Sequence, residues 1–157
     1  MKNKKTIIYI GIAIIIIILA FWYFYKANSN PVSPIVHQVS YPYMSRPMKF
    51  TVLLPNSNFQ LSEGINALFI KNKIGEIRLT RQGTNYDSLD NYLGSLNLKI
   101  VNKEDLKINS TSAIRGSIDS RIYYFIYINN WIYALSTSSP DLYSDLDQIA
   151  KSFKYTP

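Results

Sequence analysis

The sequence contains no cysteine, and this absence removes several kinds of chemistry at once. Without thiols the chain can form no disulfide, no zinc–thiolate or iron–sulfur centre and no cysteine nucleophile. Histidine is almost absent too, because His37 is the only one among 157 residues. It lies in a proline-rich stretch where we expect an exposed side chain, so a serine nucleophile would lack its usual base. A folded domain in this chain must be stabilised by its apolar core alone.

Motifs that hold phosphates, dinucleotides or metal ions are missing as well. The sequence has no P-loop, no Gly-x-Gly-x-x-Gly and no cluster of His, Asp and Glu at metal-ligand spacing. The carboxylates fall where we expect solvent, either in a turn or on an exposed helix face: Glu104, Asp105, Asp141, Asp145 and Asp147. Solvated charge explains them better than acid–base catalysis or calcium binding. We therefore predict a protein without catalytic residues, metal or cofactor, and a hydrolase is the less favoured alternative.

The net charge of +7 suggests a nucleic-acid partner, but the position of the charges argues against one. Four of the 17 basic residues flank a single apolar run: Lys2, Lys4, Lys5 and Lys26. The densest remaining basic group is interrupted by Glu76 and consists of Lys71, Lys73, Arg78 and Arg81. A nucleic-acid-binding domain usually shows a continuous basic stripe or a recognised motif, and neither is visible here. We predict no nucleic-acid partner.

The most prominent feature that is present is an apolar run of twenty residues, Thr6–Tyr25, without a charge or a proline. As a helix with a rise of about 1.5 Å per residue it would span roughly 30 Å, the thickness of the hydrocarbon core of a bilayer. Trp22, Tyr23 and Tyr25 lie at its end, where aromatic rings favour the headgroup region. The run predicts a transmembrane helix over residues 6–25, with the lipid bilayer as its partner.

The flanking lysines predict the orientation of this helix. Three lysines precede the run and only Lys26 directly follows it, which favours a cytoplasmic N-terminus over residues 1–5. We therefore predict a single-pass plasma-membrane protein with its C-terminal part outside the cytoplasm. A cleaved signal peptide is the alternative. It would need a shorter apolar region and a small-x-small cleavage site, whereas Phe21–Tyr25 consists of bulky residues only.

The remainder divides into a linker and one domain. Residues 26–48 contain four prolines and no sustained periodicity, which is typical of an extended tether. Residues 49–157 then form the extracytoplasmic domain, and a length of about 100 residues suffices for a single hydrophobic core.

Strand and helix periodicities alternate along this domain. Residues 49–54, 66–70 and 74–80 show the pattern of strands. Residues 87–96 carry apolar side chains at every third or fourth position, which predicts a helix with Asp87 as its N-cap or first-turn acid. After that helix we expect short extended segments at 98–101, 105–108 and 113–118, the first two separated by a turn at residues 102–104.

The clearest strand signal is Arg121–Thr137, with Asn129 and Asn130 suited to a two-residue hairpin turn. This turn predicts three cross-strand pairs: Ile128 with Trp131, Ile126 with Tyr133, and Tyr124 with Leu135. Both faces of the hairpin are largely apolar, so we place it in the middle of a sheet.

A terminal helix is expected to follow the hairpin. Ser139 is a candidate N-cap, and Pro140 suits the first helical position. One apolar stripe then continues to a helix end near Lys154: Leu142, Leu146, Ile149 and Phe153.

This order of elements, with Phe50–Pro55 at its start and Ile149–Phe153 at its end, resembles the PsbP-like superfamily. Residues 88–92 are similar to the middle helix of that family, and residues 133–143 to its last strand and final helix. The resemblance covers residues 49–155. It implies an α+β fold, an antiparallel sheet flanked by helices in a sandwich, and a noncatalytic accessory or binding subunit.

Four residues form the candidate interaction surface of this domain: Trp131, Tyr127, Arg78 and Arg81. The aromatic rings could stack on a sugar or a peptide, and the arginines could contact lipid headgroups or an acidic patch of a protein partner at the membrane. Sheet core and solvated strand residues are the competing interpretation. The sequence thus predicts a membrane-anchored extracytoplasmic interaction domain. The alternative is a structural or assembly subunit that uses its transmembrane helix for contacts.

Overall fold

The computed structural model describes residues 40–56 and 58–157, which belong to one compact unit, Gln38–Pro157. The cytoplasmic segment, the transmembrane helix and most of the linker predicted from the sequence lie outside these residues, as does His37. Within the described part, no helix has the length and apolar character needed to cross a membrane.

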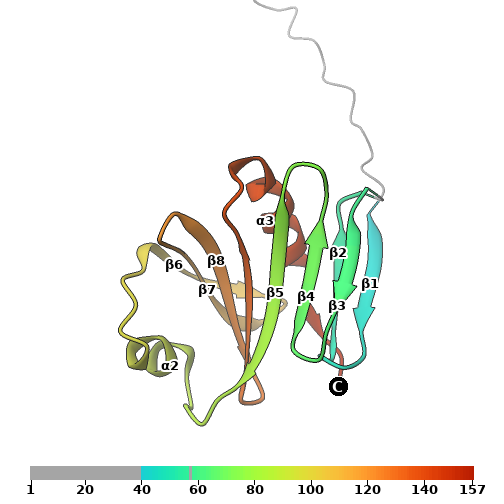
Figure 1. Ribbon diagram of the computed structural model, residues 1–157. Helices are drawn as coiled ribbons and strands as arrows, with labels where there is room; N and C mark the ends of the chain where they lie inside the picture. Colours follow the sequence, from blue (N-terminus) through green and yellow to red (C-terminus); the bar gives the residue numbers. More distant parts are fainter. Residues whose placement is uncertain (1–39, 57) are drawn as a thin grey trace, which may run out of the picture. The chain divides into compact units, whose positions relative to one another are not determined.

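The larger of two sheets has seven strands in the order β3-β4-β5-β9-β8-β7-β6, and every neighbouring pair is antiparallel (Figure 1). Its strands are β3 (Gln60–Glu63), β4 (Ala67–Lys71), β5 (Glu76–Gly83), β6 (Val101–Ile108), β7 (Thr111–Ile118), β8 (Arg121–Ile128) and β9 (Trp131–Thr137). The predicted central position of the β8–β9 hairpin is confirmed. So are its three predicted residue pairs.

The smaller sheet has the order β1-β2-β10 and consists of β1 (Tyr41–Ser45), β2 (Phe50–Leu54) and β10 (Lys154–Tyr155). Together with helix α3 (Tyr143–Ser152) it covers one face of the seven-stranded sheet and encloses the main core. Three rings from different elements meet there. The ring centroid of Phe50 lies 5.6 Å from that of Phe153 and 6.1 Å from that of Tyr133. The α+β class and the antiparallel sheet flanked by helices are thereby confirmed.

The opposite face of the seven-stranded sheet is covered only in part. Helix α2 (Leu89–Ser95) packs against β7 and β8 and forms a second, smaller apolar cluster. Its buried members are Leu89, Tyr92, Leu93, Ile114, Phe125 and Ile132. In Figure 1 this helix lies at the lower left, away from β3 and β4. Apart from Gln82 near the end of β5, whose side chain accepts a hydrogen bond from Tyr92 of α2 at 3.2 Å, the part of the face formed by β3, β4 and β5 has no described helix above it.

The folded domain begins earlier than the predicted boundary at residue 49. Strand β1 lies within the predicted linker, pairs with β2 over its whole length, and is followed by Met48, which is fully buried. Pro42 is compatible with this strand because β1 is at the edge of its sheet, where a missing backbone donor is tolerated.

One further expectation for the strands was wrong, and one strand was missed. Residues 102–104 form no turn between two segments, because β6 runs through them with an irregular register between Val101 and Glu104. Asn102 takes up this irregularity with a φ of 52°, a conformation that asparagine tolerates better than most residues. Strand β3 was not expected at all, since all four of its residues are exposed and show no apolar alternation.

The helix termini also differ from the expected ones. Helix α2 is capped by Ser88 rather than Asp87, and the Ser88 hydroxyl accepts a hydrogen bond from the Asn91 N–H at 3.2 Å. Ser139 forms no side-chain cap. Pro140–Leu142 form a 3₁₀ turn, labelled η1, ahead of α3. The last helix ends at Ser152, because the chain turns extended there to form β10.

Candidate functional site

The four residues predicted to form an interaction surface lie on two opposite faces of the seven-stranded sheet. Trp131 and Arg81 belong to the face covered by α3, since Arg81 pairs with the core residue Tyr133. Tyr127 and Arg78 belong to the other face, because side chains alternate along a strand. The structure therefore brings them together as one pair rather than as a group of four.

Arg81 and Trp131 are that pair, and their contacts are internal to the domain. The Arg81 guanidinium lies over the Trp131 ring at 4.2 Å from its centroid. Nη1 of the same group donates to the backbone carbonyl of Pro47 at 2.9 Å, and Nη2 donates to Oδ1 of Asn66 at 3.4 Å. Arg81 thus connects β5 with the segment between β1 and β2. Both terminal nitrogens of its guanidinium are therefore engaged within the domain.

Tyr127 likewise makes contacts within the domain. Its hydroxyl donates to the backbone carbonyl of Tyr86 at 3.1 Å, and its ring packs beside the cluster under α2. The side chain therefore holds the segment that leads into α2.

Arg78 differs from the other three because it points to solvent from the uncovered part of the sheet. Its guanidinium lies 5.3 Å from the centroid of the Phe69 ring on the neighbouring strand β4. The Lys71 ammonium lies 5.5 Å from the same ring and pairs with Glu76 at 2.9 Å. Among the described residues, the side chain of Arg78 has no hydrogen-bond or ion-pair partner.

The strand register places Arg78 within a continuous row of side chains that crosses the sheet. Each residue of the row pairs with the next across one strand boundary: Ser62, Phe69, Arg78, Ser136, Tyr123 and Gly116. The Tyr123 ring is stacked on Phe125, with centroids 5.3 Å apart and planes inclined by 2°. Ser136 and Gly116 are buried, and Gly116 lies beneath Ile100. We call the rest of this row, with Lys71, Glu76, Thr80, Ala134 and Arg121 beside it, the open face. Arg78 was predicted from the sequence, whereas its neighbours Phe69 and Tyr123 could not be placed beside it without the strand register.

A second candidate region is a hollow of about 570 Å³ between α3 and strands β6, β7 and β8. Asp147 of α3 is at its centre. The Tyr124 hydroxyl donates to Oδ1 of Asp147 at 2.6 Å, and Nε of Arg115 lies 3.6 Å from the same oxygen. The prediction of a fully solvated Asp147 was therefore wrong, because these neighbours on the sheet half-bury the carboxylate.

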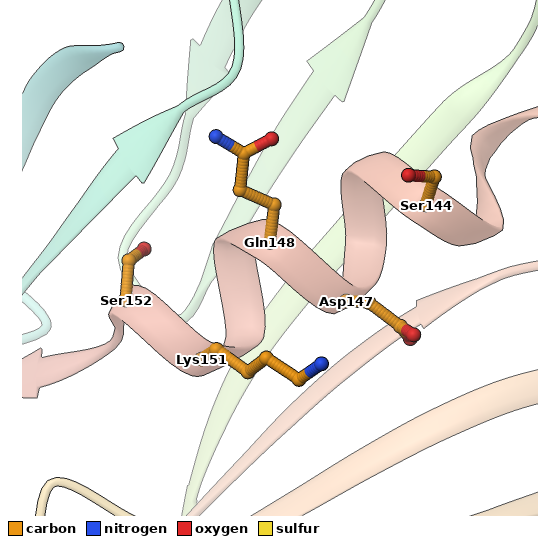
Figure 2. A pocket seen from close by; sticks show the side chains of 5 residues that line it. All are labelled: Ser144, Asp147, Gln148, Lys151 and Ser152. Carbon is orange, nitrogen blue, oxygen red and sulfur yellow. The ribbon is translucent and has the colours of Figure 1, made fainter. Parts of the chain in front are cut away.

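The outer surface of α3 carries a further shallow hollow of about 520 Å³, lined by Ser144, Asp147, Gln148, Lys151 and Ser152. Figure 2 shows Gln148 and Ser152 extending from one side of the helix and Asp147 and Lys151 from the other. Two of these side chains already serve the fold. Gln148 donates to Ser40 Oγ at 3.2 Å, and Ser152 Oγ accepts from the Leu53 N–H at 2.8 Å.

The chemistry available beside α3 is that of a structural network. Burial, together with the hydrogen bond to Asp147, raises the pKa of Tyr124 above its ordinary value, so the phenol remains a proton donor at neutral pH. The Asp147 carboxylate accepts the hydrogen bond from the Tyr124 hydroxyl and also pairs with Arg115. In the described part of the chain, no three histidine or acidic side chains are grouped as they would be around a metal ion.

No protein-family model and no curated protein matches this sequence. Solved structures do match. The solution structure of cyanobacterial PsbP (CyanoP) from Synechocystis sp. PCC 6803 is 10% identical with a TM-score of 0.52, over 78% of this chain and 95% of CyanoP. A crystal structure from Bacteroides thetaiotaomicron is also 10% identical, with a TM-score of 0.53, over 76% of this chain and 49% of the other. Such low identity establishes the fold alone. The chain has a PsbP-like fold, as its opening strand and closing helix indicated.

Proposed function

We propose that this chain is a noncatalytic interaction protein at a membrane surface, and that its open face contacts a protein partner outside the cytoplasm. One observation carries the proposal: the open face presents Arg78 over Phe69, where no described helix lies above the sheet, and Tyr123 at its border with the cluster under α2. Arginine and aromatic residues are the types most enriched at protein–protein contacts.

Photocrosslinking in intact membranes tests the proposal. A p-benzoyl-phenylalanine replaces Tyr123 on the open face or, as the control, Tyr41 in β1, whose side chain is 44% exposed. We expect a light-dependent protein adduct from position 123 and none from position 41. Absence of an adduct at 123, or equal adducts at both positions, would contradict the proposal.

An assembly role for the transmembrane helix is the second candidate function, because the uncharged run Thr6–Tyr25 is long enough to span a bilayer and to offer a contact surface there. Replacing this run with an unrelated apolar helix separates the two candidates. If the adduct from position 123 survives the exchange, the helix is a tether. If the adduct is lost although the protein remains in the membrane, the helix itself makes assembly contacts.

A further inference from the structure

We infer that the open face binds an acidic segment of a protein partner, in which a carboxylate pairs with Arg78 and a neighbouring apolar side chain lies on Phe69 or Tyr123. This inference rests on the proposed function and specifies the chemistry of the partner. Its central contact is the guanidinium of Arg78. Among the described residues, Arg78 and Arg121 are the cations of the face without a carboxylate partner, and Arg78 is the more exposed of the two.

The geometry around Arg78 prepares the guanidinium for a carboxylate. A guanidinium can stack on an aromatic ring while its planar N–H fork remains free to donate hydrogen bonds to an external acceptor. Here the Phe69 ring supplies the stacking surface at 5.3 Å. Restricting the side chain in this way reduces the entropy lost when a two-point hydrogen bond to a carboxylate forms.

The balance of charge on the open face selects an acidic partner over a basic or neutral one. Its cations are Lys71, Arg78 and Arg121, and Glu76 is its one anion. Lys71 and Glu76 neutralise each other at 2.9 Å. Arg78 and Arg121 therefore remain as net positive charge, on the same side of the sheet as the aromatic row.

The spacing of the rings indicates an extended occupant that also has apolar side chains. Phe69 on β4 and Tyr123 on β8 are separated by three strand intervals, or roughly 14 Å. An extended segment of about four to five residues covers this distance. Ser136, a small and buried residue, lies between Arg78 and Tyr123 in the row.

An anionic lipid surface is the competing source of negative charge, and the observations favour it less. Electrostatic attachment to a bilayer usually uses a cluster of roughly four to eight lysines and arginines. The open face has only two cations that are not paired within the face, and they are combined with a row of rings in register. A protein segment with alternating acidic and apolar residues fits this row better.

Binding of a defined peptide tests the inference with the full chain in nanodiscs of neutral phosphatidylcholine. The probe is a blocked peptide Glu-Phe-Glu-Phe-Glu, and its control is Gln-Phe-Gln-Phe-Gln. Affinity and contact positions are read from the amide signals of the isotope-labelled chain by NMR. We expect the acidic peptide to bind about tenfold more tightly than the neutral one, with the largest changes at Phe69, Arg78 and Tyr123.

Substitutions then separate Arg78 from general positive charge. Arg78→Gln should lower the affinity about tenfold, and Arg78→Lys severalfold because lysine lacks the planar fork. Arg46→Gln removes an equally exposed arginine outside the open face and should change the affinity less than twofold. Because Arg78 is exposed, none of these variants should shift the unfolding midpoint.

The outcomes distinguish this inference from the proposed function. Equal binding of the two peptides, or equal losses from Arg78→Gln and Arg46→Gln, would overturn the inference. A change in the NMR amide signal of Arg78 on adding phosphatidylserine to the nanodisc, without any peptide, would also overturn the inference and indicate lipid binding. If the crosslink from position 123 persists in either case, the interaction function stands and only the acidic partner is rejected.

Discussion

At the scale of single residues, two glycines with opposite surroundings show how closely the elements approach one another. A methyl group on Gly75 would collide with the Ser139 hydroxyl and come within 2.9 Å of Ser139 Cβ. A methyl group on Gly94, in α2, would meet nothing within 4 Å. The β4–β5 turn therefore needs glycine because it packs against the segment before α3, whereas α2 does not need it.

We expect Gly75→Ala to lower the free energy of unfolding by about 1–3 kcal/mol, because a packed neighbour must move. Gly94→Ala should leave it unchanged or raise it by up to about 1 kcal/mol, because alanine favours a helix. Urea unfolding of both variants measures the difference. Equal effects of the two substitutions would show that the β4–β5 turn does not contact Ser139 as described.

Buried phenols give the domain an alkaline limit of stability. Burial raises the pKa of Tyr124 and of three other tyrosines above the ordinary value of a tyrosine: Tyr43, Tyr92 and Tyr133. A group whose pKa is raised by folding contributes stability that is complete below its unfolded pKa and is lost as the pH rises above it. The unfolding midpoint in urea should therefore stay level from pH 7 to about pH 9 and fall above about pH 10.

Tyr124→Phe tests this origin of the pH dependence. The variant removes one ionising phenol, so the decline of its midpoint above pH 10 should be shallower than that of the parent chain. Tyr41→Phe, at an exposed position, serves as the control and should keep the parent slope. Identical slopes for Tyr124→Phe and the parent chain would contradict the account.

At the scale of elements, the start of α2 depends on one hydroxyl. Ser88 caps the helix through the Asn91 N–H, whereas Asp87 contacts only the side-chain amide of Asn91, at 2.7 Å. Ser88→Ala should cost about 1 kcal/mol of unfolding free energy. Asp87→Ala should cost a few tenths of a kcal/mol, as expected for an exposed contact. A larger effect at Asp87 in urea unfolding would restore the capping role that the sequence suggested.

The elements also show which parts of the fold the sequence makes predictable. The β8–β9 register follows from alternating apolar residues and from Asn129 and Asn130, both of which adopt positive φ. Local patterns suffice there. Strand β3 escaped prediction because its exposed residues gain their strand conformation only by pairing with β4. The irregularity at Asn102 is likewise set by the partner strand β7 and by no local signal.

The candidate site was predictable to a smaller extent, for the same reason. Arg78 could be identified because it is a polar residue on an alternating strand. Its neighbours Phe69 and Tyr123 come from β4 and β8, and only the sheet order brings all three into one row. Arg81 looked equivalent to Arg78 in the sequence. Arg81 lies three residues after Arg78 on the same strand, so its side chain is on the opposite face. There it contacts the Trp131 ring and donates to the Pro47 carbonyl.

At the scale of the whole molecule, the domain boundary can be tested by truncation. A chain that begins at Gln38 retains β1 and the fully buried Met48, so its urea unfolding should be cooperative. A chain that begins at Lys49 lacks both and leaves one edge of β2 unpaired. It should lose at least about 3 kcal/mol of unfolding free energy or fail to fold. Equal stability of the two chains would restore the boundary predicted from the sequence.

The central claim is that the open face is covered by a partner when the protein is in its membrane. Hydroxyl-radical footprinting tests it most directly, by comparing oxidation of Phe69 and Tyr123 in the purified full chain and in native membranes. Tyr41, on the smaller sheet, is the internal reference. We expect both open-face rings to be oxidised severalfold less in native membranes, with Tyr41 unchanged. Equal oxidation of Phe69 and Tyr123 in the two samples would contradict the account.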